Sequence, residues 1–189
     1  MPDANTGVRG YFNAIQGNFN YEDFFFKELI PHIEKTYRVR SERRYRAVSG
    51  LSMGGGGTVF YALHQPDVFA AAAPLSAATD TWFRQRMNNN ALTGISEKQL
   101  EDYLNRHTVE GFIKNASADD LKKIKSVRWY ISCGDDDFLY EDNSMMHIIF
   151  RKNEIPHEFR IKDGAHTWTY WRMELQFVLE FVAKSFMQH

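Results

Sequence analysis

Cysteine is almost absent from this chain of 189 residues, which carries Cys133 alone. One cysteine cannot form a disulfide within the chain, so no intrachain disulfide contributes to the fold. An excess of one charge is also absent, because the formal net charge is -1. This balance gives no reason to expect a nucleic acid or an acidic membrane surface as a partner.

Long apolar runs are missing too. None approaches the roughly 18 residues that a membrane-spanning helix needs. The amino end, MPDANTGVRGYFN, lacks the basic stretch and apolar core of a signal peptide. Together these absences favour a soluble chain. A hydrophobic content of 43% and an aromatic content of 15% are typical of a packed globule.

Segments with strand patterns alternate with segments that have helical patterns. The expected strands are 44–50, 68–77, 127–134 and 157–163, and the expected helices are 21–37, 54–64, 143–153 and 168–186. This alternation is the signature of a parallel sheet with helices on both faces. We therefore predict one α/β domain over residues 1–189. The more polar residues 80–125 are expected to form a helical segment inserted between strands.

The helix expected over 21–37 has apolar residues four apart, which is the spacing of one buried helix face. Asn20 precedes it and is a residue type that caps helices with its side chain. Pro31 lies inside it and is expected to bend it, since proline lacks the N–H that a helix needs.

Three expected strand ends carry reactive residues. Ser52 follows the first strand, the sequence DDDF at 135–138 follows the third, and His166 follows the fourth. Ligands of parallel α/β sheets bind at the carboxyl ends of strands. The order serine, aspartate, histidine is the order found in α/β-hydrolases.

The serine lies in GLSMG, Gly50–Gly54, which matches G-x-S-x-G. This motif is a sharp strand-to-helix turn that holds the hydroxyl clear of the sheet. It occurs by chance in roughly one chain of this length in twenty, so the motif alone is weak evidence. Its position between an expected strand and an expected helix makes the evidence stronger. Gly55–Gly57 are expected to let the helix lie close to neighbouring strands.

The chemistry assigns a role to each residue. A serine hydroxyl is a poor nucleophile and needs a base within hydrogen-bond reach, which His166 would provide. An aspartate would orient the imidazole and stabilise its positive charge. The Met53 backbone N–H, directly after Ser52, would donate one hydrogen bond to the oxyanion. The pattern alone does not choose among the acids at 135–137, and Asp142 is a further candidate that could instead start the next helix.

No histidine pair has a metal-ligand spacing, so we expect no metal and no cofactor. Aromatic residues near the predicted site suit planar acyl groups or sugar rings. Trp168 and Trp82 are the candidates for substrate contact, whereas Trp171 is expected to pack the closing helix.

Four stretches resemble the esterase D and feruloyl-esterase branch of the α/β-hydrolases, a group that includes acetyl-xylan esterases and S-formylglutathione hydrolases. They are YEDFFFKELIPHIEKTY, RAVSGLSMGG, CGDDDFLY and GAHTWTYW. The resemblance implies Ser52 as nucleophile, His166 as base and Asp137 as acid, with Asp136 as second choice. It also implies a secreted or periplasmic location, although the chain has no signal peptide and a cytoplasmic location stays open.

Members of this family usually have several strands before the point where this chain begins. They include a loop with an HG-type sequence that supplies the second oxyanion donor. We therefore expect a chain that lacks its first strands and has weakened activity, because losing one such donor typically costs about 100- to 1,000-fold in turnover. The strand at 44–50 would lie at an open sheet edge, which invites self-association.

Three functions are consistent with these features. The first is a serine esterase that removes feruloyl or acetyl groups from plant cell-wall polysaccharide. The second is a general short-chain ester or thioester hydrolase similar to S-formylglutathione hydrolase. The third is a non-catalytic fragment or binding module that has kept the motif.

Overall fold

Four parallel strands form the centre of the computed structural model, which describes residues 10–89 and 94–187. The strands are β1 (Ala47–Leu51), β2 (Ala71–Leu75), β3 (Arg128–Gly134) and β4 (His157–Lys162), and they lie side by side in this order. Every neighbouring pair is parallel. The predicted α/β class with a parallel sheet is therefore confirmed.

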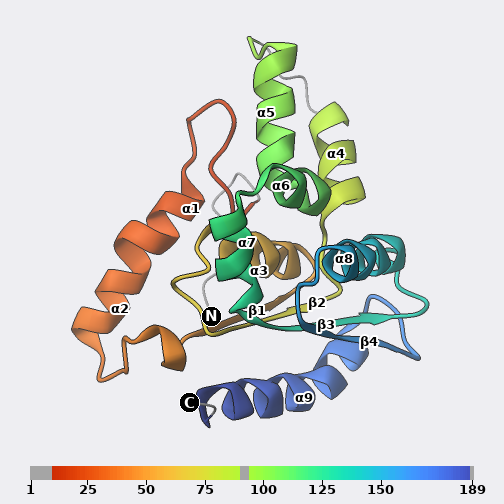
Figure 1. Cartoon of the computed structure of the whole chain (residues 1–189). Coiled ribbons are helices and arrows are strands. Elements are labelled where there is room, and N and C mark those ends of the chain that lie inside the picture. Colours follow the sequence, from red (N-terminus) through yellow and green to blue (C-terminus); the bar gives the residue numbers. More distant parts are fainter. Residues whose placement is uncertain (1–9, 90–93, 188–189) are drawn as a thin grey trace.

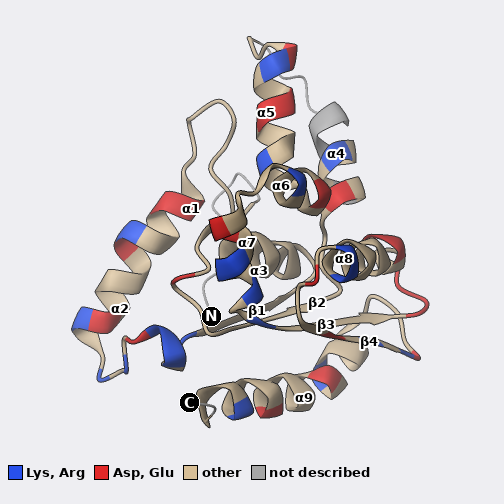
Figure 2. Ribbon diagram, in the orientation of Figure 1, with Lys and Arg blue, Asp and Glu red and all other residues tan. Residues whose placement is uncertain are grey.

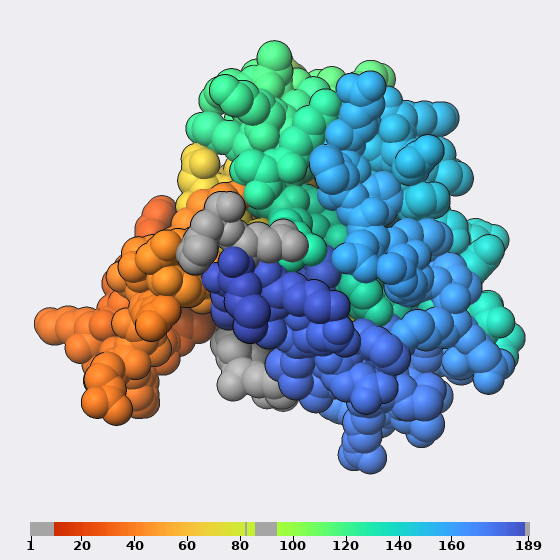
Figure 3. All heavy atoms as spheres, turned by 60° about the horizontal axis from the view of Figure 1, so that its bottom comes forward, coloured from red at the N-terminus to blue at the C-terminus, as the bar shows by residue number. Residues whose placement is uncertain are grey.

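Helices cover both faces of the sheet, which gives three layers (Figure 1). On one face lie α3 (Met53–His64), α7 (Ala118–Lys125) and α8 (Tyr140–Lys152). The opposite face carries α9 (Trp168–Met187), which Figure 3 shows running across that side of the molecule. Between β2 and β3 the chain forms α4 (Asp80–Asn89), α5 (Glu97–His107), α6 (Val109–Asn115) and α7.

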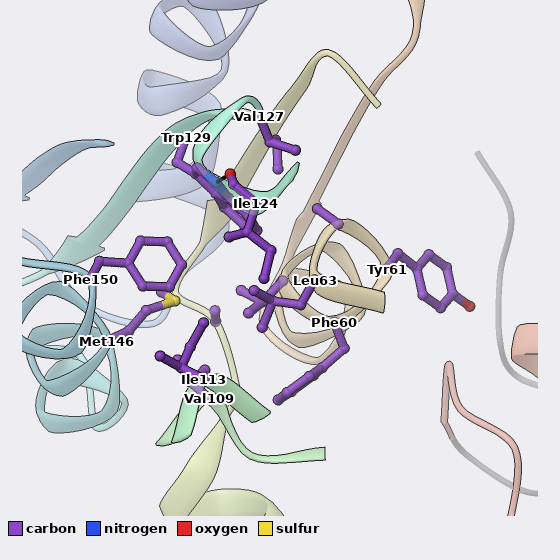
Figure 4. Close-up of a cluster of buried hydrophobic side chains, with 14 of the residues drawn as sticks. Phe60, Tyr61, Leu63, Val109, Ile113, Ile124, Val127, Trp129, Met146 and Phe150 are labelled. Atoms are coloured by element: carbon purple, nitrogen blue, oxygen red, sulfur yellow. Dashed lines mark hydrogen bonds between the residues drawn. The ribbon is translucent and has the colours of Figure 1, made fainter. Parts of the chain in front are cut away.

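The side chains of the strands alternate between two apolar clusters, as a strand period of two requires. Ala72, Trp129 and Ile131 pack into the cluster beneath α3 and α8, part of which is shown in Figure 4. The residues next to them, including Ala71 and Tyr130, pack against α9 instead. Because both faces are covered, β2 and β3 are almost entirely apolar or small.

Charged residues lie mainly on the outer helices and loops, while α3 has none (Figure 2). The loop between β3 and α8 begins with three consecutive aspartates, at 135–137. Among the described helices, none combines the length and hydropathy that a membrane span requires.

The helix expected over 21–37 is one helical run with a π-helical turn inside it. It consists of α1 (Tyr21–Phe24), the π-helix η1 (Phe25–Leu29) and α2 (Ile30–Thr36). Pro31, near the start of α2, has no N–H for the regular i→i−4 pattern, and the wider turn directly precedes it.

The expected side-chain cap by Asn20 is wrong. Its side chain makes no capping bond. The Asp23 N–H instead donates to Asn13 Oδ1 at 3.1 Å. Asn13 reaches this position because its backbone forms an isolated antiparallel bridge with Asn20.

The first strand begins later than expected. Residues Arg43–Tyr45 form a 3₁₀ turn, η2, and β1 starts only at Ala47. Within the described part of the chain, β1 pairs with β2 alone and so lies at one edge of the sheet.

Candidate active site

Ser52 lies on the sharp turn that joins β1 to α3. Its backbone has φ 55° and ψ -120°, a conformation that L-residues rarely adopt. Hydrogen bonds to neighbouring segments hold it there. The Ser52 N–H donates to the Leu75 carbonyl at 2.9 Å, and the Ser52 carbonyl accepts from Gly56 N–H and Ala78 N–H at 3.0 Å each. The turn is therefore fixed to the end of β2.

Close backbone contacts explain the glycines around Ser52. A Cβ on Gly50 would lie 2.4 Å from the Gly54 carbonyl oxygen, and one on Gly56 would lie 2.2 Å from the Ala78 carbonyl oxygen. Neither distance is tolerable for a real side chain. Gly54 itself has room for a Cβ, since its nearest neighbour would be 3.6 Å away. The weak helix propensity of this turn is thus offset by close packing of α3 against β2.

His166 lies in the loop between β4 and α9, and its imidazole connects two other predicted residues. His166 Nε2 is 2.9 Å from Ser52 Oγ. His166 Nδ1 is 3.0 and 2.9 Å from the two carboxylate oxygens of Asp137. An ionised carboxylate only accepts hydrogen bonds, so Nδ1 carries the proton and Nε2 is left to accept from the serine hydroxyl. Folding therefore joins Ser52, His166 and Asp137 in one chain of hydrogen bonds.

Each aspartate after β3 has a different place. Asp137 is fully buried and also accepts from the Leu139 N–H at 2.9 Å. Asp136 is exposed and contributes its backbone N–H, which donates to the Gly164 carbonyl. The Asp135 carboxylate accepts from the Gly164 N–H at 3.0 Å and so ties down the loop that carries His166. The structure therefore brings Asp137, and not Asp136, to the imidazole.

Asp142, the other acidic candidate, lies on α8. Its two carboxylate oxygens accept from the Thr81 N–H at 3.1 Å each, at the start of α4. This carboxylate links α8 to α4, whereas the two ring nitrogens of His166 bond to Asp137 and Ser52.

Cys133 is a second nucleophilic group near the site, on β3. Burial, and then the nearby charge of Asp137, raise the pKa of its thiol to about 12. The thiolate is the reactive form of cysteine. Cys133 therefore stays a neutral thiol at physiological pH, whereas the Ser52 hydroxyl lies within hydrogen-bond distance of an imidazole.

Trp171 packs against the His166 imidazole from the interior of the molecule. Its ring lies 4.8 Å from that of His166 at 86°, and it is buried, as expected. Its Nε1–H donates to Ser76 Oγ at 3.0 Å. Ser76 follows β2 directly and has a positive φ of 45°. Trp171 therefore fixes one side of His166, which agrees with its expected packing role.

Two other aromatic rings near the site are exposed. Trp168 is 60% exposed and meets Trp171 edge-on at 5.4 Å. Phe138 is 70% exposed and lies 4.5 Å from the His166 ring. Sequence reasoning missed Phe138, although it directly follows Asp137 in DDDF. Trp82 lies on α4, but its side chain falls outside the described ones, so its expected role stays a prediction.

A buried polar network under the sheet supports the histidine loop. Glu174 of α9 is almost fully buried and accepts from Tyr130 Oη at 3.0 Å, Ser132 Oγ at 2.7 Å and Lys162 Nζ at 2.5 Å. Lys162 ends β4, four residues before His166. The network therefore fixes the strand end before the loop to the helix that follows it.

Met53 opens α3 directly after Ser52, which is the position that supplies one oxyanion donor in α/β-hydrolases. One acidic group among the described residues, Asp135, Asp136 and Asp163, has carboxylates within 4.8 Å of one another. All three are exposed, and such groups are common on surfaces. The role of Met53 and the expected absence of a metal stay predictions.

The parallel sheet and the serine on a strand-to-helix turn define the α/β-hydrolase class. The family model described as "Putative esterase" matches residues 6–181. The chain belongs to this esterase family.

Known relatives give more detail. A solved ferulic acid esterase matches with TM-score 0.78 and 35% identity, over 94% of this chain and 65% of that one. S-formylglutathione hydrolase of Staphylococcus aureus matches with TM-score 0.69 and 25% identity, over 92% and 67%. Acetyl esterase of Caldicellulosiruptor saccharolyticus is 22% identical, over 87% of this chain and 64% of the relative. The chain thus spans about two thirds of the length of these relatives.

Proposed function

We propose that this chain is a serine carboxylester hydrolase that removes feruloyl or acetyl groups from plant cell-wall polysaccharide. The hydrogen-bonded chain of Ser52, His166 and Asp137 carries the proposal. The similarity to a ferulic acid esterase and to an acetyl esterase supports the acyl groups. Because a cell-wall substrate lies outside the cell, the proposal includes a secreted or periplasmic location.

The geometry is suited to an acyl-enzyme mechanism. Ser52 Oγ attacks the ester carbonyl while His166 Nε2 takes its proton, and Asp137 stabilises the imidazolium. The negative charge on the carbonyl oxygen is stabilised by the Met53 N–H. The bond to the alcohol then breaks, and Nε2 returns the proton to the leaving oxygen. Water, activated by the same imidazole, then releases the acid from Ser52.

Labelling with a fluorophosphonate probe tests the nucleophile, because an unactivated serine does not react with it. We expect stoichiometric labelling of the wild type and none of Ser52→Ala. Asp137→Asn should lower the turnover of esters by roughly 10⁴-fold, as loss of the orienting acid does in other triads. Asp136→Asn is the matched control and should leave turnover within about twofold. Absence of labelling would favour a non-catalytic binding module.

A second candidate is a short-chain ester or thioester hydrolase, which the similarity to S-formylglutathione hydrolase favours. A panel of acetyl, butyryl and feruloyl esters together with an acyl thioester separates the two. The highest kcat/KM on feruloyl or acetyl sugar esters supports the first proposal. The highest value on the thioester would replace it with the second.

A further inference from the structure

Phe138 is an exposed ring held against the imidazole of the proposed catalytic histidine. The residues on either side of it, Asp137 and Leu139, are both buried, while Phe138 itself is 70% exposed. Its ring centroid lies 4.5 Å from that of His166, with the two planes at 46°. The turn after β3 therefore buries the Asp137 carboxylate and leaves the Phe138 ring at the surface beside the same imidazole.

The proton route defines which part of an ester lies near this ring. His166 Nδ1 is committed to Asp137, and Nε2 faces Ser52 Oγ at 2.9 Å. Nε2 is therefore the nitrogen that must return the proton to the departing alcohol. That alcohol oxygen has to come within hydrogen-bond reach of Nε2, about 3 Å. The alcohol part of the substrate consequently lies beside the imidazole, while the acyl carbon is bound to Ser52.

Two aromatic rings contact the imidazole among the described residues, Phe138 and Trp171. Trp171 is buried and its indole N–H is already bonded to Ser76, so it has little surface to offer a ligand. Phe138 is open to solvent. Of these two rings, Phe138 is therefore the one that offers surface to a bound alcohol.

We propose that Phe138 is the specificity residue for the alcohol part of the ester, against which a sugar ring packs while its oxygen leaves. The proposal rests on the proposed function and deepens it. Aromatic rings in ligand sites contribute a flat apolar surface beside a few polar groups. The C–H face of a pentose ring matches that surface in size, whereas a methyl group covers little of it. Phe138 thus selects carbohydrate esters over esters of small alcohols.

The test compares two esters of ferulic acid, one with arabinose and one with methanol. Phe138→Ala should lower kcat/KM for the arabinose ester about fivefold to tenfold, in the range of one aromatic contact. For the methyl ester we expect less than a twofold change, since that alcohol does not reach the ring. Phe138→Tyr keeps the ring and should keep the preference. Met145→Ala removes another exposed apolar side chain, on α8, and should change neither rate.

The outcomes separate this proposal from the proposed function. Equal losses on both esters would overturn the specificity role and make Phe138 a positioning residue for His166. Unchanged rates on both esters would overturn it as well. A wild-type chain that hydrolyses neither ester and is not labelled at Ser52 would overturn the proposed function, and this proposal with it.

Discussion

The buried histidine His107 makes the fold sensitive to acid in a way that can be measured. His107 is the last residue of α5, and its ring is stacked on Phe83 at 5.6 Å and lies 4.1 Å from the ring of Tyr103. Its Nδ1–H donates to the Tyr103 carbonyl at 2.8 Å. Burial, and then the nearby His64, lower the pKa of His107 from 6.5 to about 3. The folded chain therefore holds this imidazole neutral.

The imidazole binds its proton more tightly in the unfolded chain than in the folded chain, so acid favours unfolding. The unfolded chain takes up the proton near pH 6.5, whereas the folded chain does so only near pH 3. Stability is therefore complete above pH 6.5 and is lost as the pH falls from 6.5 towards 3. Each pH unit by which the pH falls in this window lowers the free energy of unfolding by about 1.4 kcal/mol. Between pH 8 and pH 4.5 His107 should cost about 3 kcal/mol of unfolding free energy.

Urea unfolding of the wild type and His107→Gln at pH 8 and pH 4.5 tests this value. Glutamine stays neutral and keeps an N–H donor for the Tyr103 carbonyl. Between pH 8 and pH 4.5 the unfolding free energy of the wild type should fall by about 3 kcal/mol more than that of His107→Gln. His32→Gln removes an exposed histidine of α2 and should lose as much as the wild type. Equal losses in the wild type and His107→Gln would refute a neutral buried imidazole.

Three further predictions follow from contacts described above. Glu174→Gln should lower the unfolding free energy by about 1–3 kcal/mol in thermal or urea melts, because an amide cannot accept from all three donors. The exposed Glu180→Gln is its control and should change stability by less than about 1 kcal/mol, and a similar loss in both would contradict the role of burial. Gly56→Ala should destabilise the chain by about 1–3 kcal/mol and slow fluorophosphonate labelling of Ser52, since the added Cβ meets the Ala78 carbonyl. If Gly56→Ala is labelled at the wild-type rate, the turn tolerates the displacement that the added Cβ causes. Finally, the β1 edge should cause self-association that rises with concentration in sedimentation velocity, and a monomer at every concentration would contradict it.

Much of the fold was predictable because its patterns are local. The four strands and the closing helix follow from apolar runs and helical periodicity, and the glycines around Ser52 identify the turn before any contact is known. The π-helical turn at Phe25–Leu29 and the replacement of Asn20 by Asn13 as the capping residue were not predictable. The replacement depends on how the segment before α1 folds back, and no local pattern decides whether Pro31 is accommodated by a kink or by a wider turn.

The chain order of the serine, the acid and the histidine in the candidate site was predictable. Which of the acids at 135–137 contacts the histidine was not. Ser52 and His166 stand alone at their strand ends, whereas the acids at 135–137 share one pattern. Only the geometry of the turn separates the buried Asp137 from Asp135, which holds the histidine loop instead. Phe138 lies in the same turn, between the buried Asp137 and Leu139, and its exposure also depends on the geometry of that turn.

Under the proposed function, the positive φ of Ser52 sets catalysis against stability at a single residue. Side chains held in such a conformation cost the folded state about 1–3 kcal/mol, and glycine alone adopts it freely. Ser52→Gly should therefore give a chain that is harder to unfold and chemically inert. A homologue that no longer needs to hydrolyse esters would gain stability from glycine at this position. A homologue that keeps the serine must gain that stability from other residues.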